Sequence, residues 1–331
     1  MKKGNLLSYA FGLFQVLLTL GMFFLLSRAI HWHMVGISLS KIPLVTLFVG
    51  FCSYIFLTVL RALRFQLLGA GLSKSMDTVA LVWVQNLTNN LLPARLGDGA
   101  YMFLSNRLGA IPAGQSGAAV LIVIVSDILS IFILLGIALL VTGNPFPVSS
   151  LSVCALVVIG AFVPFAALLK GAFFTKLLFA RMKNAKHRYI WRKLSEFHNG
   201  LERVGHVKIF AHLFLLSICI NTLSAFIGFI VLRALNIKLT FWQASVALSA
   251  HLLGYLLPVQ PIGGWGVFEG TLAMGLKVYG IHVQRALDAS LAFHCISYLF
   301  FAPLGLIGIV YILVKHAIVR RSKHRPSVQR N

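Results

Sequence analysis

The sequence predicts an all-α integral membrane protein with six full transmembrane helices and two re-entrant, broken-helix hairpins. Hydrophobic residues make up 59% of the 331-residue chain and charged residues only 11%, whereas a soluble domain carries about 25% charged residues. Several apolar runs reach the roughly 20 residues that a helix needs to cross a bilayer. The positive charge lies mainly between these runs, where it sets the topology.

Six apolar runs are long enough to span the membrane. The first follows a basic N-terminus, but it is longer than the apolar region of a signal peptide. We therefore expect an uncleaved first transmembrane helix. The six runs cover residues 6–26, 43–60, 118–142, 151–169, 209–232 and 289–314.

Two shorter apolar segments break at proline and glycine. The first breaks at Pro93 and the second at Pro258, and an amphipathic piece follows each break. We predict that they form broken hairpins over residues 76–107 and 241–279. The alternative is that each half-segment spans the membrane separately, which adds further crossings.

Basic residues cluster at the N-terminus, in a turn at 61–64, in segment 170–208 and in the tail 315–331. The positive-inside rule places all four in the cytoplasm. Two crossings must then separate each consecutive pair, so the broken segments must re-enter on the same side. We expect one multi-pass membrane domain over residues 1–331 in the cell (inner) membrane, with both termini cytoplasmic.

The net charge of +22 does not indicate a nucleic-acid partner, because it follows the membrane topology. Segment 170–208 interleaves basic and apolar side chains, which is typical of an interfacial helix on an anionic leaflet. We expect this segment and the tail 315–331 to contact such a leaflet. The four cysteines lie in apolar runs without CxxC spacing, so they predict neither a disulfide framework nor a metal site. The sequence leaves a homo-oligomer open.

The sequence contains a short internal repeat. Residues 59–63 and 231–235 both read Val-Leu-Arg-Ala-Leu, and each copy closes a span that precedes a broken segment. In the predicted topology the copies face opposite sides, which would make an inverted repeat with paired broken helices, as in many secondary transporters. The alternative is a chance match of five common residues.

The first break carries two opposite charges on non-helical backbone. Arg95 can bind a phosphate with two hydrogen bonds, and a half-helix N-terminus also favours an anion. Gly97 allows close approach of a ligand. Asp98 would balance a cationic part of a headgroup or couple protons. The alternative is a structural ion pair between Arg95 and Asp98.

Asp127 lies well inside the span at 118–142. A charge in the hydrocarbon region is costly and marks function by default. Asp127 would contact substrate or a proton, or it would be a buried structural partner of an arginine such as Arg95 or Arg107.

The second break has glycines whose backbone amides can face a ligand. They are Gly263, Gly264 and Gly266. Glu269 closes the break and would bind a cationic group or a proton, or pair with Arg285 or Lys277. His251 and His294 lie in apolar segments, where a histidine is more often a packed, hydrogen-bonded side chain than a ligand.

No motif for established catalysis is present. The chain contains neither GxxxxGK[ST], HExxH nor GxSxG. We therefore predict no ATP motor, no cofactor and no catalytic residues. Whether the protein catalyses any reaction stays open, although its pattern is closer to a transporter.

Both breaks resemble the signatures of one family. Residues 92–98 read Leu-Pro-Ala-Arg-Leu-Gly-Asp, similar to a proline-x-Arg-x-Gly-acidic signature. Residues 262–270 are similar to a glycine-glycine-x-glycine-x-x-glutamate signature. Both belong to the flippase-like membrane domain of lysylphosphatidylglycerol synthetases and its stand-alone homologues. The resemblance covers residues 5–316, including the 61–64 turn and a closing span with proline and glycine.

The resemblance implies a lipid translocase for an anionic, aminoacylated or polyprenyl-type membrane lipid. The synthetases add a cytoplasmic aminoacyl-transferase domain, which we expect this chain to lack. The alternatives are a membrane transferase, with Glu269 and His251 as its candidate groups, and a non-catalytic scaffold in cell-envelope lipid or glycan assembly. The predicted substrate-binding residues are Arg95, Gly97, Asp98, Arg107, Asp127, Gly263, Gly264, Gly266 and Glu269.

Overall fold

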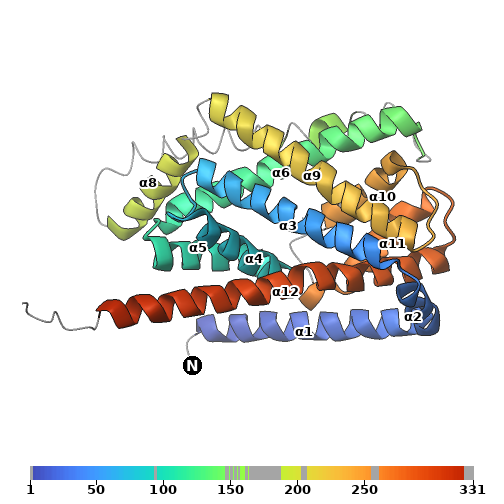
Figure 1. Ribbon diagram of the computed structural model, residues 1–331, viewed down its shortest axis with the longest axis horizontal. Helices are drawn as coiled ribbons and strands as arrows, with labels where there is room; N and C mark the ends of the chain where they lie inside the picture. Colours follow the sequence, from blue (N-terminus) through green and yellow to red (C-terminus); the bar gives the residue numbers. More distant parts are fainter. Residues whose placement is uncertain are drawn as a thin grey trace, which may run out of the picture.

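A computed structural model describes residues 3–92, 95–145, 188–202, 207–254 and 261–323, with isolated positions between 149 and 163. Every regular element in these ranges is a helix (Figure 1). The elements are α1 (Lys3–Ala29), α2 (Trp32–Ser40), α3 (Leu44–Leu67), α4 (Ser75–Leu91), α5 (Leu96–Gly109), α6 (Ala113–Thr142), α8 (Arg188–Glu202), α9 (Val207–Ala234), α10 (Phe241–Gly254), η3 (Ile262–Gly264), α11 (Val267–Lys277) and α12 (Val283–Lys323).

Four of the described helices, α3, α6, α9 and α12, are long and apolar enough to cross a membrane. A fifth candidate is the bent pair of α1 and α2, which meet at 81°. The chain is thus a multi-pass helical membrane protein. The predicted span 151–169 and the start of segment 170–208 lie almost entirely outside the described residues, so six spans remain a prediction.

The long helices run along one common direction in Figure 1. The N-terminal end of α1, the C-terminal end of α12 and helix α8 lie at the same end of the molecule (Figure 1). Helices α4 and α5 lie toward that end, whereas α10 and α11 lie toward the opposite end (Figure 1). The two broken segments therefore occupy opposite halves of the bundle.

Helices from the first half of the chain, α3, α4 and α6, pack against helices from the second half, α9, α10 and α12. The two helices that carry the Val-Leu-Arg-Ala-Leu copies, α3 and α9, pack against each other and run in opposite directions. Helix α4 packs against α12, and α10 packs against α6. Each broken segment thus has a helix that packs on a long helix from the other half of the chain.

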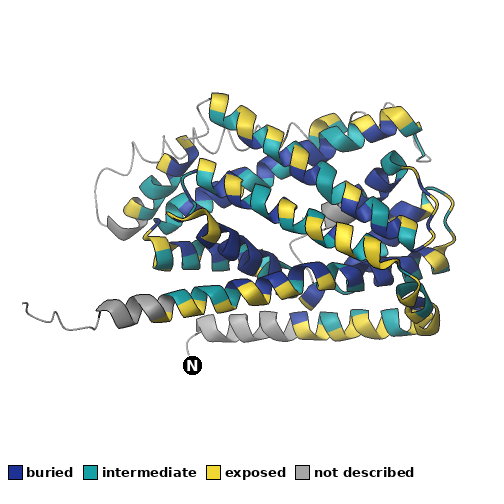
Figure 2. Cartoon of the chain, in the orientation of Figure 1, coloured by how far each residue is buried: buried dark blue, intermediate teal, exposed yellow. Residues whose placement is uncertain are grey.

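Helix α1 lies at the edge of the bundle, and Figure 2 shows much of its described part exposed. Its exposed side chains are large and apolar, including Leu17 (58%) and Leu20 (60%). Such a surface suits contact with lipid. A polar contact ties α1 to the second break, because Thr19 Oγ1 accepts a hydrogen bond of 2.9 Å from the Ile262 amide.

Helix α8 is the described part of the basic segment, and it packs on α6. The Glu196 carboxylate accepts hydrogen bonds from Lys193 Nζ (2.9 Å) and from the Gly114 amide (3.4 Å). Burial raises the pKa of Glu196, but these hydrogen bonds and the neighbouring cations outweigh burial and hold the pKa below its ordinary value. The contact fixes this basic helix at one end of the bundle.

One glycine in each broken segment lets its two helices, α4 and α5 or α10 and α11, pack in close contact. A Cβ on Gly97 of α5 would lie 2.4 Å from the Gln85 carbonyl oxygen of α4. A Cβ on Gly275 of α11 would lie 2.5 Å from the Ala247 carbonyl oxygen of α10. Small residues at these crossings allow close backbone packing, as in other membrane helix pairs.

Replacing Gly97 with Ala is expected to lower the free energy of unfolding by about 1–3 kcal/mol through overpacking. Gly99 on the same helix is the matched control, because a Cβ there meets nothing within 4 Å. Both variants gain the same helix propensity, so their difference isolates packing. Chemical unfolding in detergent measures the effect. Equal stability of the two variants would show that α4 and α5 leave room for a Cβ at residue 97 and would contradict this prediction.

Candidate functional site

A cavity of about 290 Å³ opens among α3, α4, α6 and α9–α12. Both broken segments reach it, the first through Asn86, Asn89, Asn90 and Arg95 and the second through Leu248 and Phe268. Polar and charged groups come mainly from α3 to α6. The opposite wall is mostly aromatic and aliphatic, with a few small polar side chains. Those polar side chains are Asn221, Ser224 and Ser297.

Arg61 contributes a positive charge to the cavity wall. Its Nη1 donates a 2.8 Å hydrogen bond to Asn86 Oδ1. Among the described residues, no carboxylate forms a salt bridge with Arg61, whereas both Arg64 and Arg95 have one. A cation within a membrane is costly unless it is paired or faces a water-filled path. Arg61 therefore presents an uncompensated charge to the cavity.

The sequence pattern did not indicate this role for Arg61, because residues 61–64 were expected to form a turn. The turn is wrong. Helix α3 continues to Leu67 and carries both arginines inside the bundle. The two guanidinium groups are stable inside the bundle because each has a polar partner on a facing helix. The available signal was the absence of glycine, proline or another turn residue directly after the arginines.

Asn86 adds a second free donor beside Arg61. Its side chain is buried, with a relative exposure of 7%, and its Oδ1 is occupied by Arg61. Its Nδ2 makes no hydrogen bond with any described residue. A buried donor without a partner is costly, so an acceptor that reached Asn86 Nδ2 would be bound favourably. Arg61 and Asn86 together form a donor pair for an oxygen-rich group.

Arg95 lines the cavity next to this pair, but it is already neutralised. Its Nε lies 3.2 Å from Asp98 Oδ2. Asp98 Oδ1 also accepts hydrogen bonds from Gln85 Nε2 (2.9 Å) and Asn89 Nδ2 (2.8 Å). The ion pair considered from the sequence is therefore present, and it fastens the break to α4.

The backbone of Arg95 is left-handed, with φ of 54°. This conformation is unfavourable for a residue with a Cβ by roughly 1–2 kcal/mol. Such strain is typical of functional sites, where the surrounding structure compensates for it. Here the Asp98 network holds the break in that shape.

Asp127 lines the cavity, but its partner is not one of the two arginines expected from the sequence. Arg64 of α3 binds both of its carboxylate oxygens, with 3.3 Å between Arg64 Nη2 and Asp127 Oδ2. Arg64 also donates a 2.9 Å hydrogen bond to Ser217 Oγ of α9. The expected ion pair with an arginine is present, but its partner is Arg64 rather than Arg95 or Arg107, because the rotation of α3 brings Arg64 to α6.

Arg107 lies outside the cavity lining, exposed, with its guanidinium 6.0 Å from the centre of the Phe103 ring. A helix rises 1.5 Å per residue, so the twelve positions after Arg95 move it about 18 Å along the axis. Gly97 shares the break but packs against α4 rather than a ligand.

The second break is built on left-handed glycines. They are Gly263 (φ 72°), Gly264 (φ 71°) and Gly266 (φ 89°). The Gly266 amide donates a 2.7 Å hydrogen bond to Glu269 Oε2. This bond caps the start of α11. None of these glycines lines the cavity.

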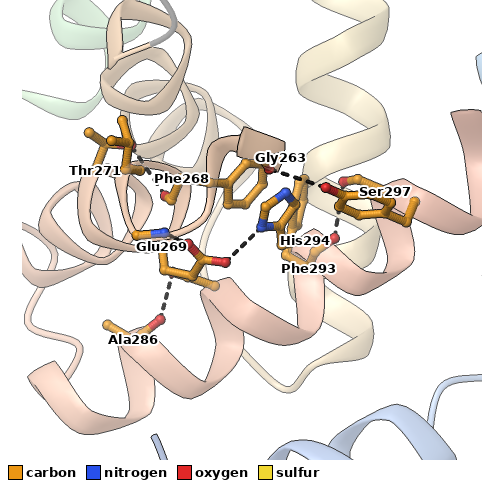
Figure 3. Close-up of polar contacts among 12 residues, drawn as sticks. Gly263, Phe268, Glu269, Thr271, Ala286, Phe293, His294 and Ser297 are labelled. Atoms are coloured by element: carbon orange, nitrogen blue, oxygen red, sulfur yellow. Dashed lines mark hydrogen bonds and ion pairs between the residues drawn. The ribbon is translucent and has the colours of Figure 1, made fainter. Parts of the chain in front are cut away.

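Glu269 is fully buried and contacts His294 of α12, with 2.6 Å between Oε1 and Nδ1 (Figure 3). The alternative pairing with Lys277 or Arg285 is absent, and Arg285 donates instead to the Asn236 carbonyl. The His294 ring stacks on Phe268, 4.1 Å between centroids, and Phe268 lines the cavity. Glu269 thus fastens the second break to α12 and reaches the cavity only through its neighbour.

The structure brings together Arg95 and Asp127 of the predicted site, and it adds Arg61 and Asn86. It leaves Arg107 and Glu269 away from the cavity wall. His251, the candidate partner of Glu269 in a transferase, has a side chain outside the described residues.

A family described as Lysylphosphatidylglycerol synthase TM region matches residues 12–305. The match spans both breaks and every helix that lines the cavity. No curated protein and no solved structure matches the chain. The chain therefore belongs to the family of transmembrane regions of lysylphosphatidylglycerol synthases.

Proposed function

We propose that this protein moves a phosphate-bearing lipid across the inner membrane without an ATP motor of its own. The observation that carries the proposal is Arg61, a guanidinium that faces a cavity inside a membrane bundle without a carboxylate partner among the described residues. Guanidinium groups bind phosphate through paired, charge-assisted hydrogen bonds. The headgroup would enter the cavity while the acyl chains stay in lipid.

Two further residues support a phosphate at this place. Asn86 lies on the same wall as Arg61, and its buried Nδ2 makes no hydrogen bond with the described residues. Arg95 stands beside them and can share its charge between Asp98 and a ligand. Arg64 and Asp127 do not need to touch the lipid, because their pair holds α3 against α6.

The reciprocal helix contacts support a transport mechanism. In an inverted repeat, rocking one half against the other exposes a central site to each side in turn. In this scheme the broken segments would be re-entrant hairpins from opposite sides of the membrane. Their positions toward opposite ends of the bundle and their shared contact with the cavity support it. The end of the bundle that carries α8 and the C-terminal end of α12 would face the anionic cytoplasmic leaflet.

The competing transferase needs acid or base groups at the substrate. Glu269 is fully buried against His294 and does not line the cavity. The geometry therefore favours movement over chemistry. A scaffold would not need the uncompensated charge of Arg61, which is costly to keep in a membrane.

The test is a reconstitution in vesicles that contain a fluorescent phospholipid, with an impermeant quencher to report lipid that changes leaflet. We expect the protein to accelerate movement, and mass spectrometry of the extracted lipid to show an unchanged mass. Ser224→Trp should return movement to the protein-free rate, because Ser224 lines the cavity and the indole would fill it.

Leu215→Trp is the matched control, since Leu215 lies on the same helix with a 60% exposed side chain. This variant should move lipid like the wild type. A changed lipid mass would favour the transferase. No movement of any phosphate-bearing lipid, with the protein folded, would contradict the proposal.

A further inference from the structure

The charges around the cavity do not cancel. Among the described residues at the cavity wall or paired with it, three guanidinium groups stand against two carboxylates. The guanidinium groups belong to Arg61, Arg64 and Arg95, and the carboxylates to Asp98 and Asp127. Glu269 is outside this count, because it lies behind the wall against His294. One positive charge is left over, and it is on Arg61. A ligand with one net negative charge would neutralise the site, and a ligand with a net positive charge would add to the excess.

The nearby carboxylates are also already engaged. Asp127 is bound through both oxygens by Arg64. Asp98 accepts hydrogen bonds from two side-chain amides and lies beside Arg95. Glu269 is held by His294 and the Gly266 amide and is fully buried. Within the described residues, no carboxylate stands free at the cavity to receive an ammonium group.

We infer that the cavity selects lipids whose headgroup is net anionic and discriminates against headgroups that carry an added aminoacyl cation. This inference rests on the proposed function and names its substrate class. The family description alone would suggest lysylphosphatidylglycerol as the lipid. The inference excludes that lipid as the preferred substrate, because a lysyl ester makes a phosphatidylglycerol headgroup net positive. The specificity arises from repulsion, because the unpaired positive charge of Arg61 disfavours a headgroup that is itself net positive.

The experiment compares three labelled lipids in the same vesicles: phosphatidylglycerol, its lysyl ester and a polyprenyl phosphate. We expect the lysyl ester to move more slowly than phosphatidylglycerol by about tenfold or more. Faster movement of the polyprenyl phosphate than of phosphatidylglycerol would identify the polyprenyl lipid as the source of the anionic group. Faster movement of phosphatidylglycerol would identify a phospholipid.

One variant tests the charge argument directly. Asn86→Asp keeps the acceptor that binds Arg61, but it places a carboxylate beside the guanidinium and cancels the excess charge. The preference for anionic lipid should then fall to about onefold or reverse. Gln243→Glu is the matched control, because Gln243 lies away from the cavity and its acceptor contact with the Thr240 amide is preserved. This control should keep the wild-type preference.

Binding gives a second readout that does not depend on movement. A lipid that binds the folded protein raises its unfolding temperature, so each lipid is added to detergent-purified protein and its effect measured. Stabilisation by phosphatidylglycerol and not by the lysyl ester supports the inference. Equal stabilisation, or equal movement of both lipids, overturns it and leaves the translocase intact. Absence of all movement with selective stabilisation would remove the proposed function and keep the anionic site.

Discussion

Arg61→Gln is expected to reduce lipid movement by about tenfold to a hundredfold, because hydrogen bonds to a charged group contribute about 1.5–3 kcal/mol. The substitution keeps a polar but shorter side chain and removes the only cation at the cavity that lacks a carboxylate partner in the described structure. The assay is the reconstituted movement of phosphatidylglycerol described above. Loss of the hydrogen bond to Asn86 should lower the free energy of unfolding by about 1–3 kcal/mol, so movement is compared on protein shown to be folded.

The chain offers a matched control for this variant in its own repeat. Arg233 holds the same place in the second Val-Leu-Arg-Ala-Leu copy, but it is exposed and lies over the Phe229 ring at 5.9 Å. Arg233→Gln should keep wild-type movement. Arg61→Lys should retain part of the activity, because the charge remains but paired binding of phosphate is lost. If both glutamine variants behave alike, the role assigned to Arg61 is wrong.

Asp127→Ala is expected to lower the free energy of unfolding by about 3 kcal/mol, which is typical when one partner of a buried ion pair is removed. The remaining Arg64 side chain is only 2% exposed, so its charge would stay without a counterion. The value lies at the low end of the usual range because the Asp127 side chain is 29% exposed. Chemical unfolding in detergent measures the loss.

A double variant separates an unpaired charge from lost packing. Removing both charges with apolar residues of similar size is often neutral, so Arg64→Met with Asp127→Leu should recover most of the stability lost in Asp127→Ala. Arg107→Ala should have no measurable effect, since Arg107 is exposed. A double variant as unstable as the single one would indicate that packing, rather than charge, dominates at this contact.

The helical architecture could be predicted from the sequence because its signals are local. Long apolar runs predicted four spans that are found as α3, α6, α9 and α12. Proline and glycine predicted the two interruptions, which lie between α4 and α5 and between α10 and α11. These features depend on backbone chemistry that each segment carries by itself.

The partners of the charged side chains could not be predicted, because they depend on how each helix is rotated against its neighbours. Arg61 and Arg64 are three residues apart and so share one face of α3. One meets Asn86 of α4 and the other meets Asp127 of α6. The sequence pattern instead favoured a cytoplasmic turn at this point, since basic residues after an apolar run usually mark the membrane boundary.

The second break shows the same limit. The glycines and Glu269 stood out in the sequence, but their role depends on His294, which lies in the last long helix. No local pattern links a glutamate to a histidine on another helix. The contact with His294 shows that Glu269 fixes the broken helix, while the adjacent Phe268 lines the cavity.

The most direct measurement is native mass spectrometry of the detergent-purified protein, which shows whether a phospholipid stays bound. If Arg61 binds a lipid phosphate in the cavity, the wild type and Arg233→Gln should retain a phospholipid that Arg61→Gln loses. Equal retention by all three proteins would contradict the account, because the bound lipid would then not depend on the one unpaired cation that the described structure places at the cavity.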